Sequence, residues 1–253
     1  MLGLLTLTLV ISHLALLQAG FPKDSEEICS FYVGAEDTPL TSYKFTRIGD
    51  TPVNILALGD CELTVVAVGG GGWGATGSGG SGYVVTNSFT VYPFTPSQLV
   101  VRVGGPGENS SLQISEGGTI ITAQSGGNAH VYNGGAGYSG GGGGNYNYIS
   151  GGYGGANGGD GQDSAYGDPG GAGSGFDIST ISLTKFSLSP GAGGQRGSQY
   201  GGGGGGLMVD GAGPQKTVHD GQGYGGGGFN QYVTPGGGRP GPGIVLLEIK
   251  IKH

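Results

Sequence analysis

Uninterrupted runs of glycine limit what this sequence can fold into more than any other feature. Runs of four to six glycines cover residues 69–72, 140–144, 201–206 and 225–228, and glycine contributes 64 of the 253 residues. Glycine has no side chain to bury and loses more backbone entropy on ordering than any other residue. Backbone contacts must therefore hold these runs if they are ordered, and the alternative is a disordered zone.

Short runs of β-branched and aromatic residues flank and interrupt the glycine, and such runs predict strands. We expect strands at residues 43–48, 53–58, 63–68, 83–85, 88–92, 99–103, 119–123 and 244–251. Turns are expected at residues 49–52 and 59–60. Little or no helix is expected after the N-terminal segment. A sheet that pairs the last strand with the early ones would bring the glycine-rich chain back to it, which favours order over disorder.

Glycine-rich chain can form extended helices of the polyproline-II type, with three residues per turn. Without side chains, such helices can approach closely and pair backbone to backbone, which satisfies their amides. Large residues within the glycine zone would anchor them, namely Trp73, Tyr138, Tyr153, Tyr166, Tyr200, Leu207, Met208 and Tyr224. Collagen is excluded, because the glycines keep no strict third-residue period.

Residues 1–20 are apolar and carry no charged side chain, and an acidic cluster follows them. This pattern predicts a secretory signal peptide that is cleaved near Ala19 or Gly20. The alternative is an N-terminal membrane anchor, because the apolar run has a marginal length for a span. With cleavage, the protein is expected to be extracellular and to have no membrane contact.

The chain contains two cysteines, Cys29 and Cys61. An oxidising compartment favours a disulfide between them, which would tie the N-terminal segment to the first strong strand. Two free thiols are the alternative. Metal binding by this pair is poorly supported, because two sulfurs without a nearby histidine make half a site.

The chain has a formal net charge of −7, and its ten lysines and arginines are scattered. We therefore expect no nucleic-acid partner, because phosphate binding needs clustered basic residues. Residues 137–141 match the G-x-S-x-G nucleophile elbow with Ser139, and His219 and Asp210 could be proposed as base and orienter. No helix is indicated after Ser139, and glycine abundance produces such matches by chance, so we expect neither an enzyme nor a cofactor.

Two further motifs predict modification or ion binding. Residues 158–166 resemble one copy of a calcium-binding nonapeptide through Asp160 and Asp163, but the motif normally works as tandem copies. These aspartates are a weak calcium candidate, and a solvated loop is the alternative. Asn109 begins an N-glycosylation sequon in what we expect to be a polar turn after a strand.

The order of strands and glycine runs resembles the glycine-rich extracellular domain of the anaplastic lymphoma kinase and leukocyte tyrosine kinase receptors. The resemblance is carried by residues 63–80, 88–108, 200–207 and 243–249. It implies an all-β fold, with a tumour-necrosis-factor-like or jelly-roll-type β-sandwich joined to a bundle of polyglycine helices. The chain lacks most of the family's cysteines, so receptor signalling and ligand contacts are not implied.

We divide the chain into a signal peptide (1–20), an N-terminal segment with the first strands (21–68), a glycine-rich region with interleaved strands (69–238) and a closing strand (239–253), with 21–253 as one domain. Segments rich in glycine and tyrosine resemble those of shell and cuticle matrices, and charged residues make up 11% of the chain. The composition predicts a secreted, non-catalytic component of an extracellular or biomineral matrix, whose partners are matrix components or copies of itself. The alternative is a secreted recognition module with a cell-surface protein partner, as the receptor resemblance suggests.

Overall fold

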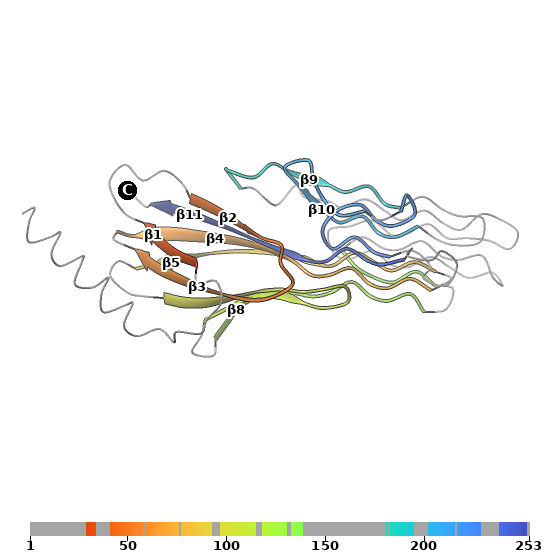
Figure 1. Ribbon diagram of the computed structural model, residues 1–253, viewed down its shortest axis with the longest axis horizontal. Helices are drawn as coiled ribbons and strands as arrows, with labels where there is room; N and C mark the ends of the chain where they lie inside the picture. Colours follow the sequence, from red (N-terminus) through yellow and green to blue (C-terminus); the bar gives the residue numbers. More distant parts are fainter. Residues whose placement is uncertain are drawn as a thin grey trace, which may run out of the picture.

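The computed structural model describes residues 29–33, 41–57, 59–75, 77–92, 97–114, 118–130, 133–138, 181, 183–194, 202–215, 217–228 and 238–251. Throughout these residues the fold is all-β and contains no helix (Figure 1). The strands lie at one end of the molecule, and the glycine-rich segments continue from them towards the other end.

The strands form two main sheets and a short third one. The first has the order β1–β3–β6–β7–β8 and consists of β1 (Cys29–Val33), β3 (Gly49–Ala57), β6 (Ser97–Val103), β7 (Ser110–Ile114) and β8 (Gly118–Ala123). The second has the order β2–β11–β4–β5 and consists of β2 (Thr41–Phe45), β11 (Ile244–Ile251), β4 (Cys61–Val68) and β5 (Val84–Val91). The third pairs β10 (Leu207–Val209) with β9 (Leu188–Pro190). Neighbouring strands are antiparallel except β1 and β3, which are parallel.

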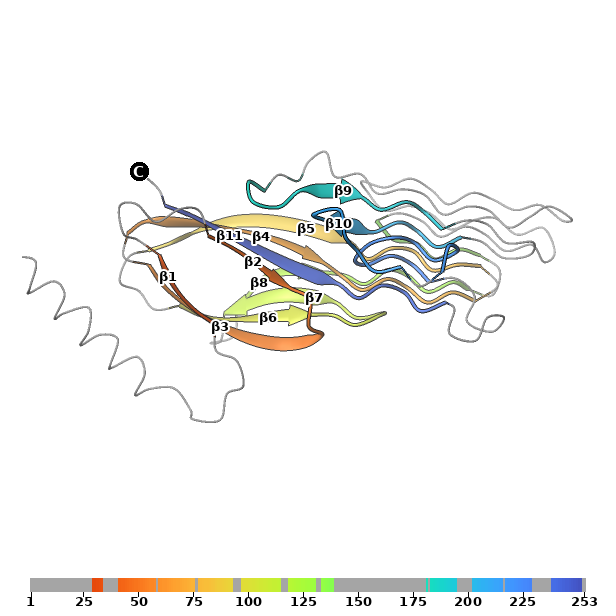
Figure 2. The same cartoon turned by 45° about the horizontal axis from the view of Figure 1, so that its top comes forward.

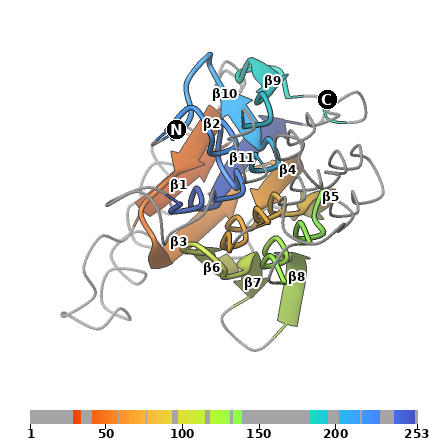
Figure 3. The ribbon, with the colours of Figure 1, turned by 90° about the vertical axis from the view of Figure 1, so that its right-hand side faces the viewer.

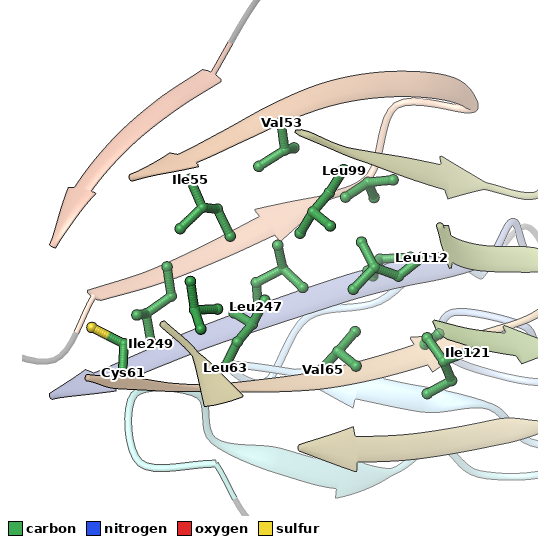
Figure 4. Packing of buried hydrophobic residues seen from close by; sticks show 14 of the residues in the cluster. Val53, Ile55, Cys61, Leu63, Val65, Leu99, Leu112, Ile121, Leu247 and Ile249 are labelled. Atoms are coloured by element: carbon green, nitrogen blue, oxygen red, sulfur yellow. The ribbon is translucent and has the colours of Figure 1, made fainter. Parts of the chain in front are cut away.

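The two main sheets pack face to face around one hydrophobic core. Alternate residues of β3, β4, β6 and β11 point inwards, as the two-residue period of a strand requires. Figure 4 shows Val53, Leu99 and Leu112 of one sheet facing Leu63 and Leu247 of the other. These side chains are buried and come from strands far apart in the sequence. Burial of their apolar surface is the main force that holds the sheets together.

A second apolar cluster covers the outer face of the four-stranded sheet. Val66 and Leu246 point away from the main core, and residues 183–188 together with β10 pack over them. The middle strands β4 and β11 are therefore buried on both faces over part of their length, which explains their nearly continuous apolar sequence. Figure 2 shows β9 and β10 lying above this sheet.

The predicted strands are confirmed, with shifted ends and two corrections. Residues 83–85 and 88–92, expected as two strands, form the single strand β5. Residues 49–52, expected as a turn, begin β3. Pro52 is tolerated there because β1 pairs with β3 only from Val53 onwards, so, within the described part of the chain, residues 49–52 have β6 on one side and no strand on the other.

The strands β1, β7, β9 and β10 were not expected from the sequence. β7 begins within the sequon that we assigned to a turn, and both Ser110 and Ser111 are buried. The Ser110 hydroxyl oxygen accepts a hydrogen bond from the Gly104 amide at 2.9 Å, which makes the burial of this polar side chain tolerable. β9 and β10 have three residues each and adjoin glycine-rich chain, so no alternating pattern marks them.

Candidate functional site

Glycine-rich segments that extend beyond the strands form the most unusual part of the molecule, and we call their described residues the glycine layer. The layer comprises residues 69–72, 79–83, 104–108, 124–127, 134–138, 191–194, 202–206, 220–228 and 238–243. Several of its segments continue a strand directly, as residues 69–72 continue β4 and residues 238–243 lead into β11. Seen from the far end, the coloured segments lie side by side in front of the strands (Figure 3).

Successive amides of one glycine segment donate to different neighbouring segments. The bonds run from Gly69 N to Tyr83 O (3.0 Å), Gly70 N to Glu108 O (2.9 Å), Gly71 N to Gly241 O (2.9 Å) and Gly72 N to Gly80 O (2.9 Å). The first and fourth amides thus reach the same neighbour, and the two between them reach two others. A strand in a sheet has neighbours on two sides, so this arrangement differs from a sheet ladder.

The same three-residue step recurs between other segments. Three pairs of antiparallel segments show it, each through two bonds from an amide N to a carbonyl O. The bonds are Gly69 to Tyr83 and Gly72 to Gly80 in the first pair, Gly79 to Gly228 and Gly82 to Gly225 in the second, and Gly80 to Gly127 and Tyr83 to Gln124 in the third. In each pair the donor moves on by three residues while the acceptor moves back by three. These bonds supply partners for amides that are buried, where an unpaired amide would cost free energy.

The segments approach too closely for side chains. A Cβ atom built on a glycine of residues 69–72 would overlap a carbonyl oxygen of another segment. The overlaps are Gly69 with Gln124, Gly70 with Gly105, Gly71 with Gly226 and Gly72 with Gly127. Glycine is therefore required here for backbone packing, which is the use of glycine that close approach of two chains demands.

Three of the predicted anchors tie the glycine layer to the four-stranded sheet. Tyr138 and Leu207 are buried in the second apolar cluster beside Val68, and Tyr224 packs against it. Leu207 also exchanges two backbone hydrogen bonds with Tyr224, at 2.9 and 2.8 Å. Met208 is likewise buried, whereas the predicted anchors Tyr153, Tyr166 and Tyr200 lie outside the described residues.

Trp73, the one tryptophan of the chain, follows the first glycine run. Its amide donates to Asn128 Oδ1 at 2.8 Å, and its carbonyl accepts from Ala129 N at 2.8 Å. Its Nε1 atom would lie 3.2 Å from a Cβ at Gly107, a residue with a φ of +76°. The indole therefore packs over a turn whose conformation favours glycine, and a Cβ at residue 107 would crowd the ring.

Cys61 is a buried free thiol in this structure, and its Sγ donates to Gly59 O at 3.3 Å. Burial raises the pKa of this thiol, and the neighbouring Asp60 carboxylate raises it further. A thiol in such surroundings is poorly reactive, because the thiolate is the nucleophile.

The predicted disulfide between Cys29 and Cys61 stays a prediction, because the side chain of Cys29 is not described. The backbone register nevertheless bears on it. β1 runs parallel to β3 with Cys29 beside Val53 and Val33 beside Ala57, so Val33 lies level with the turn that leads to Cys61. Four strand residues span about 13 Å, and a disulfide needs Cα atoms within about 7 Å of each other. By this register, Cys29 lies at the end of β1 that is farther from that turn.

Asn109 lies in an exposed turn before β7, as expected, although the rest of its sequon is in the strand. Its Oδ1 accepts a hydrogen bond from Ser125 N at 2.9 Å. A glycan would be attached through the amide nitrogen, so glycosylation is compatible with this bond and remains a prediction.

Of the three candidate catalytic residues, the structure describes Asp210 and His219. Asp210 Oδ1 accepts a hydrogen bond from Ser187 N at 3.0 Å, and its Oδ2 lies 3.6 Å from Lys44 Nζ. This carboxylate therefore binds groups on the outer face of the four-stranded sheet. His219 contributes its carbonyl oxygen to the glycine layer, where it accepts from Gly203 N at 2.9 Å. Ser139, the calcium candidates Asp160 and Asp163, and the cleavage-site residues Ala19 and Gly20 lie outside the described residues.

Within the part of the chain that the structure describes, His, Cys, Asp and Glu side chains nowhere gather in a group of three or more that could hold a metal ion. The described residues also include no helix with the length and apolar character of a membrane span.

Comparison with models of known protein families gives no match. Comparison with curated protein sequences gives no match either.

Proposed function

We propose that this protein is a secreted, non-catalytic structural component of an extracellular or biomineral matrix. The observation that carries the proposal is the use of glycine in the glycine layer. Its amides and carbonyls form hydrogen bonds between its own segments, and many of its α-carbons face carbonyl oxygens of neighbouring segments. Such packing favours a stiff building block over an elastic tail or a mobile binding loop.

The finer fold that we propose is a jelly-roll or tumour-necrosis-factor-like sandwich joined to a bundle of polyglycine helices of the polyproline-II type. The helical part is supported by the three-residue step of the hydrogen bonds, which equals the residues per turn of such a helix. It is also supported by the several neighbours that each glycine segment contacts. The sandwich part is supported by the shared core of the two main sheets.

The proposed location is extracellular, and it is supported by the apolar segment at residues 1–20. The proposed partners are other matrix components or further copies of the chain. The low share of charged residues, 11%, supports self-association, because few charged side chains would have to lose their water when copies pack together.

A secreted recognition module is the second candidate. It is supported by the combination of a two-sheet core with a glycine layer, which agrees with the architecture expected from the receptor resemblance. In that case the glycine layer would act as a rigid support for a binding face, and the partner would be a cell-surface protein.

Fractionation of the source tissue tests the first proposal. After extraction with detergent and then with mild acid, a matrix component should remain in the insoluble fraction. The purified mature chain should also form assemblies in sedimentation experiments as its concentration is raised. Full solubility and a monomer at high concentration would overturn the matrix proposal. Saturable binding of the labelled monomer to cells would then support the recognition module, and non-saturable binding would argue against it.

A further inference from the structure

A short segment without regular secondary structure lies across the outer face of the four-stranded sheet. We call residues 183–187 the strap; they lead directly into β9. Leu183 and Phe186 are partly buried against the second apolar cluster. Because the strap has no strand or helix of its own, its position depends on its contacts with the sheet.

The side chain of Glu248 on β11 holds one end of the strap. This residue is 1% exposed, and its Oε2 accepts hydrogen bonds from Thr184 N at 2.7 Å and from Lys185 N at 2.9 Å. Its Oε1 has no hydrogen-bond partner among the described groups and lies 3.3 Å from Lys250 Nζ. A buried carboxylate needs such partners, because desolvation of an unpaired charge is costly.

The other end of the strap is held by Asp210. Its amide donates to Ser187 O at 2.7 Å and its Oδ1 accepts from Ser187 N at 3.0 Å. Its Oδ2 faces Lys44 on β2. Two carboxylates therefore clamp the backbone of the strap, and the one at Glu248 is buried while the one at Asp210 is partly exposed.

Few side chains around Glu248 could supply a negative charge in its place once it is protonated. The strands on either side place Thr64 and Ser42 opposite Glu248. The charged groups on the elements packed around it are Lys250 on β11, Glu62 on β4, Lys44 on β2, Lys185 on the strap and Asp210 after β10. Among these, Lys250 makes the close contact with the carboxylate, so protonation of Glu248 would leave a cation beside a neutral buried group.

We propose that the strap is a pH-operated closure, in which ionised Glu248 holds the end of the strap at Thr184 and Lys185 on the sheet and protonated Glu248 releases that end. In the closed form the carboxylate accepts two charge-assisted hydrogen bonds, which are about twice as strong as neutral ones. Protonation removes the charge, weakens both bonds and ends the ion pair with Lys250. Release exposes the apolar outer face around Val66 and Leu246.

Amide exchange at Thr184 and Lys185 tests the proposal, because these two amides donate to Glu248. Exchange rates of the full mature chain are measured between pH 7 and about pH 3 and divided by the intrinsic rate at each pH. We expect the protection of these amides to fall about tenfold in acid, while amides of β4 and β11 change less than about twofold. A dye that binds apolar surface should gain fluorescence over the same pH range.

Variants separate Glu248 from other acids. Glu248→Gln keeps the shape without the charge, so its strap amides should show at pH 7 the weak protection that the natural protein shows in acid. Glu62→Gln, which changes a neighbouring acid on β4 that has no bond to the strap, should behave like the natural protein. The proposal is overturned if the natural protein protects the strap equally at both pH values. It is also overturned if the strap and β11 lose protection together, because the acid change would then be global unfolding.

Discussion

The α-carbon of Gly79 faces the carbonyl oxygen of Gly72 so closely that a Cβ at residue 79 would overlap that oxygen. The two residues belong to neighbouring segments of the glycine layer, and the Gly72 amide donates to Gly80 O at 2.9 Å beside this contact. The neighbour is backbone and cannot rotate away as a side chain could. Tolerance to substitution in the layer should therefore depend on where each α-carbon points.

Substitution of Gly79 by alanine should strongly destabilise the protein. The added methyl group must push two hydrogen-bonded segments apart, and we expect the free energy of unfolding to fall by about 3 kcal/mol or more. Urea denaturation followed by circular dichroism measures the change. If Gly79→Ala proves as stable as the natural protein, the glycine layer does not pack as described.

Gly105→Ala provides the matched control within the same layer. A Cβ at Gly105 would have its nearest neighbour 3.5 Å away, at a side-chain atom of Glu108, and its φ is not in the left-handed region. The expected change in the free energy of unfolding is below about 1 kcal/mol. Equal damage from the two substitutions would indicate a general intolerance of alanine rather than specific close approach.

Ionisation of Glu248 should contribute to global stability in a pH-dependent way. Burial alone would raise the pKa of Glu248, but the amides of Lys185 and Thr184 and the Lys250 ammonium bring it below its ordinary value. A carboxyl whose pKa is lowered by folding stabilises the folded state above its unfolded pKa, about 4.3, and loses that contribution as the pH falls through its folded pKa. The natural protein should therefore be more stable than Glu248→Gln at pH 7, by about 1–3 kcal/mol.

That difference should shrink as the pH falls below about 4. Chemical denaturation of both proteins at several pH values measures it, and Asp50→Asn serves as the control, because the Asp50–Arg102 ion pair is half exposed and should contribute little. A constant difference between the natural protein and Glu248→Gln across this range would show that the charge of Glu248 does not matter to stability.

The sheets could be predicted from the sequence more fully than the glycine layer. β4 and β11 each contain a run of four apolar residues, 65–68 and 244–247, where the strand is buried on both faces, and such runs are readily recognised as strands. β7 was missed because its first residues are serines. Ser110 can be buried because its hydroxyl accepts from the Gly104 amide, and Ser111 accepts from Gln113 Nε2, and no sequence pattern marks either bond. Local sequence identified strands where apolar residues gather and missed them where a backbone group satisfies a polar side chain.

The contacts of the glycine layer could not be predicted, for a physical reason. Register in a sheet is specified by side chains that must point inwards, and a run such as residues 201–206 offers none. The partners of Gly79 and Gly72 are fixed instead by the strands that deliver each segment. The role of Glu248 was also missed, because Glu248 and Lys250 alternate with apolar residues as in a strand with one solvent-exposed face, and the strap that buries Glu248 has no recognisable sequence pattern.

Asn109 should carry an N-linked glycan when the protein is made by secreting eukaryotic cells. The residue is exposed, and Oδ1 can keep its bond to Ser125 N while the amide nitrogen carries the sugar. Treatment with a peptide N-glycosidase should increase the gel mobility of the natural protein. Asn109→Asp removes the acceptor nitrogen but keeps an oxygen for Ser125, so it should fold equally well and show no mobility change. An untreated natural protein with its bare polypeptide mass would contradict the prediction.

The glycine layer and the sheets should unfold together. Segments of the layer continue β4, β6, β8 and β11 without a linker, and bonds such as Gly243 N to Gly104 O, at 2.9 Å, join segments that enter and leave different sheets. Loss of the layer would free the ends of these strands, so neither part should persist alone.

Fluorescence of Trp73 reports on the layer, because this is the one tryptophan and its backbone forms hydrogen bonds with Asn128 and Ala129. Circular dichroism reports on the sheets, and the two signals should give the same midpoint in urea. The same comparison in Gly107→Ala, which crowds the indole, should show altered fluorescence of the folded protein with the two midpoints still equal. A fluorescence transition at clearly lower urea than the circular dichroism transition would mean that the layer melts independently of the sheets.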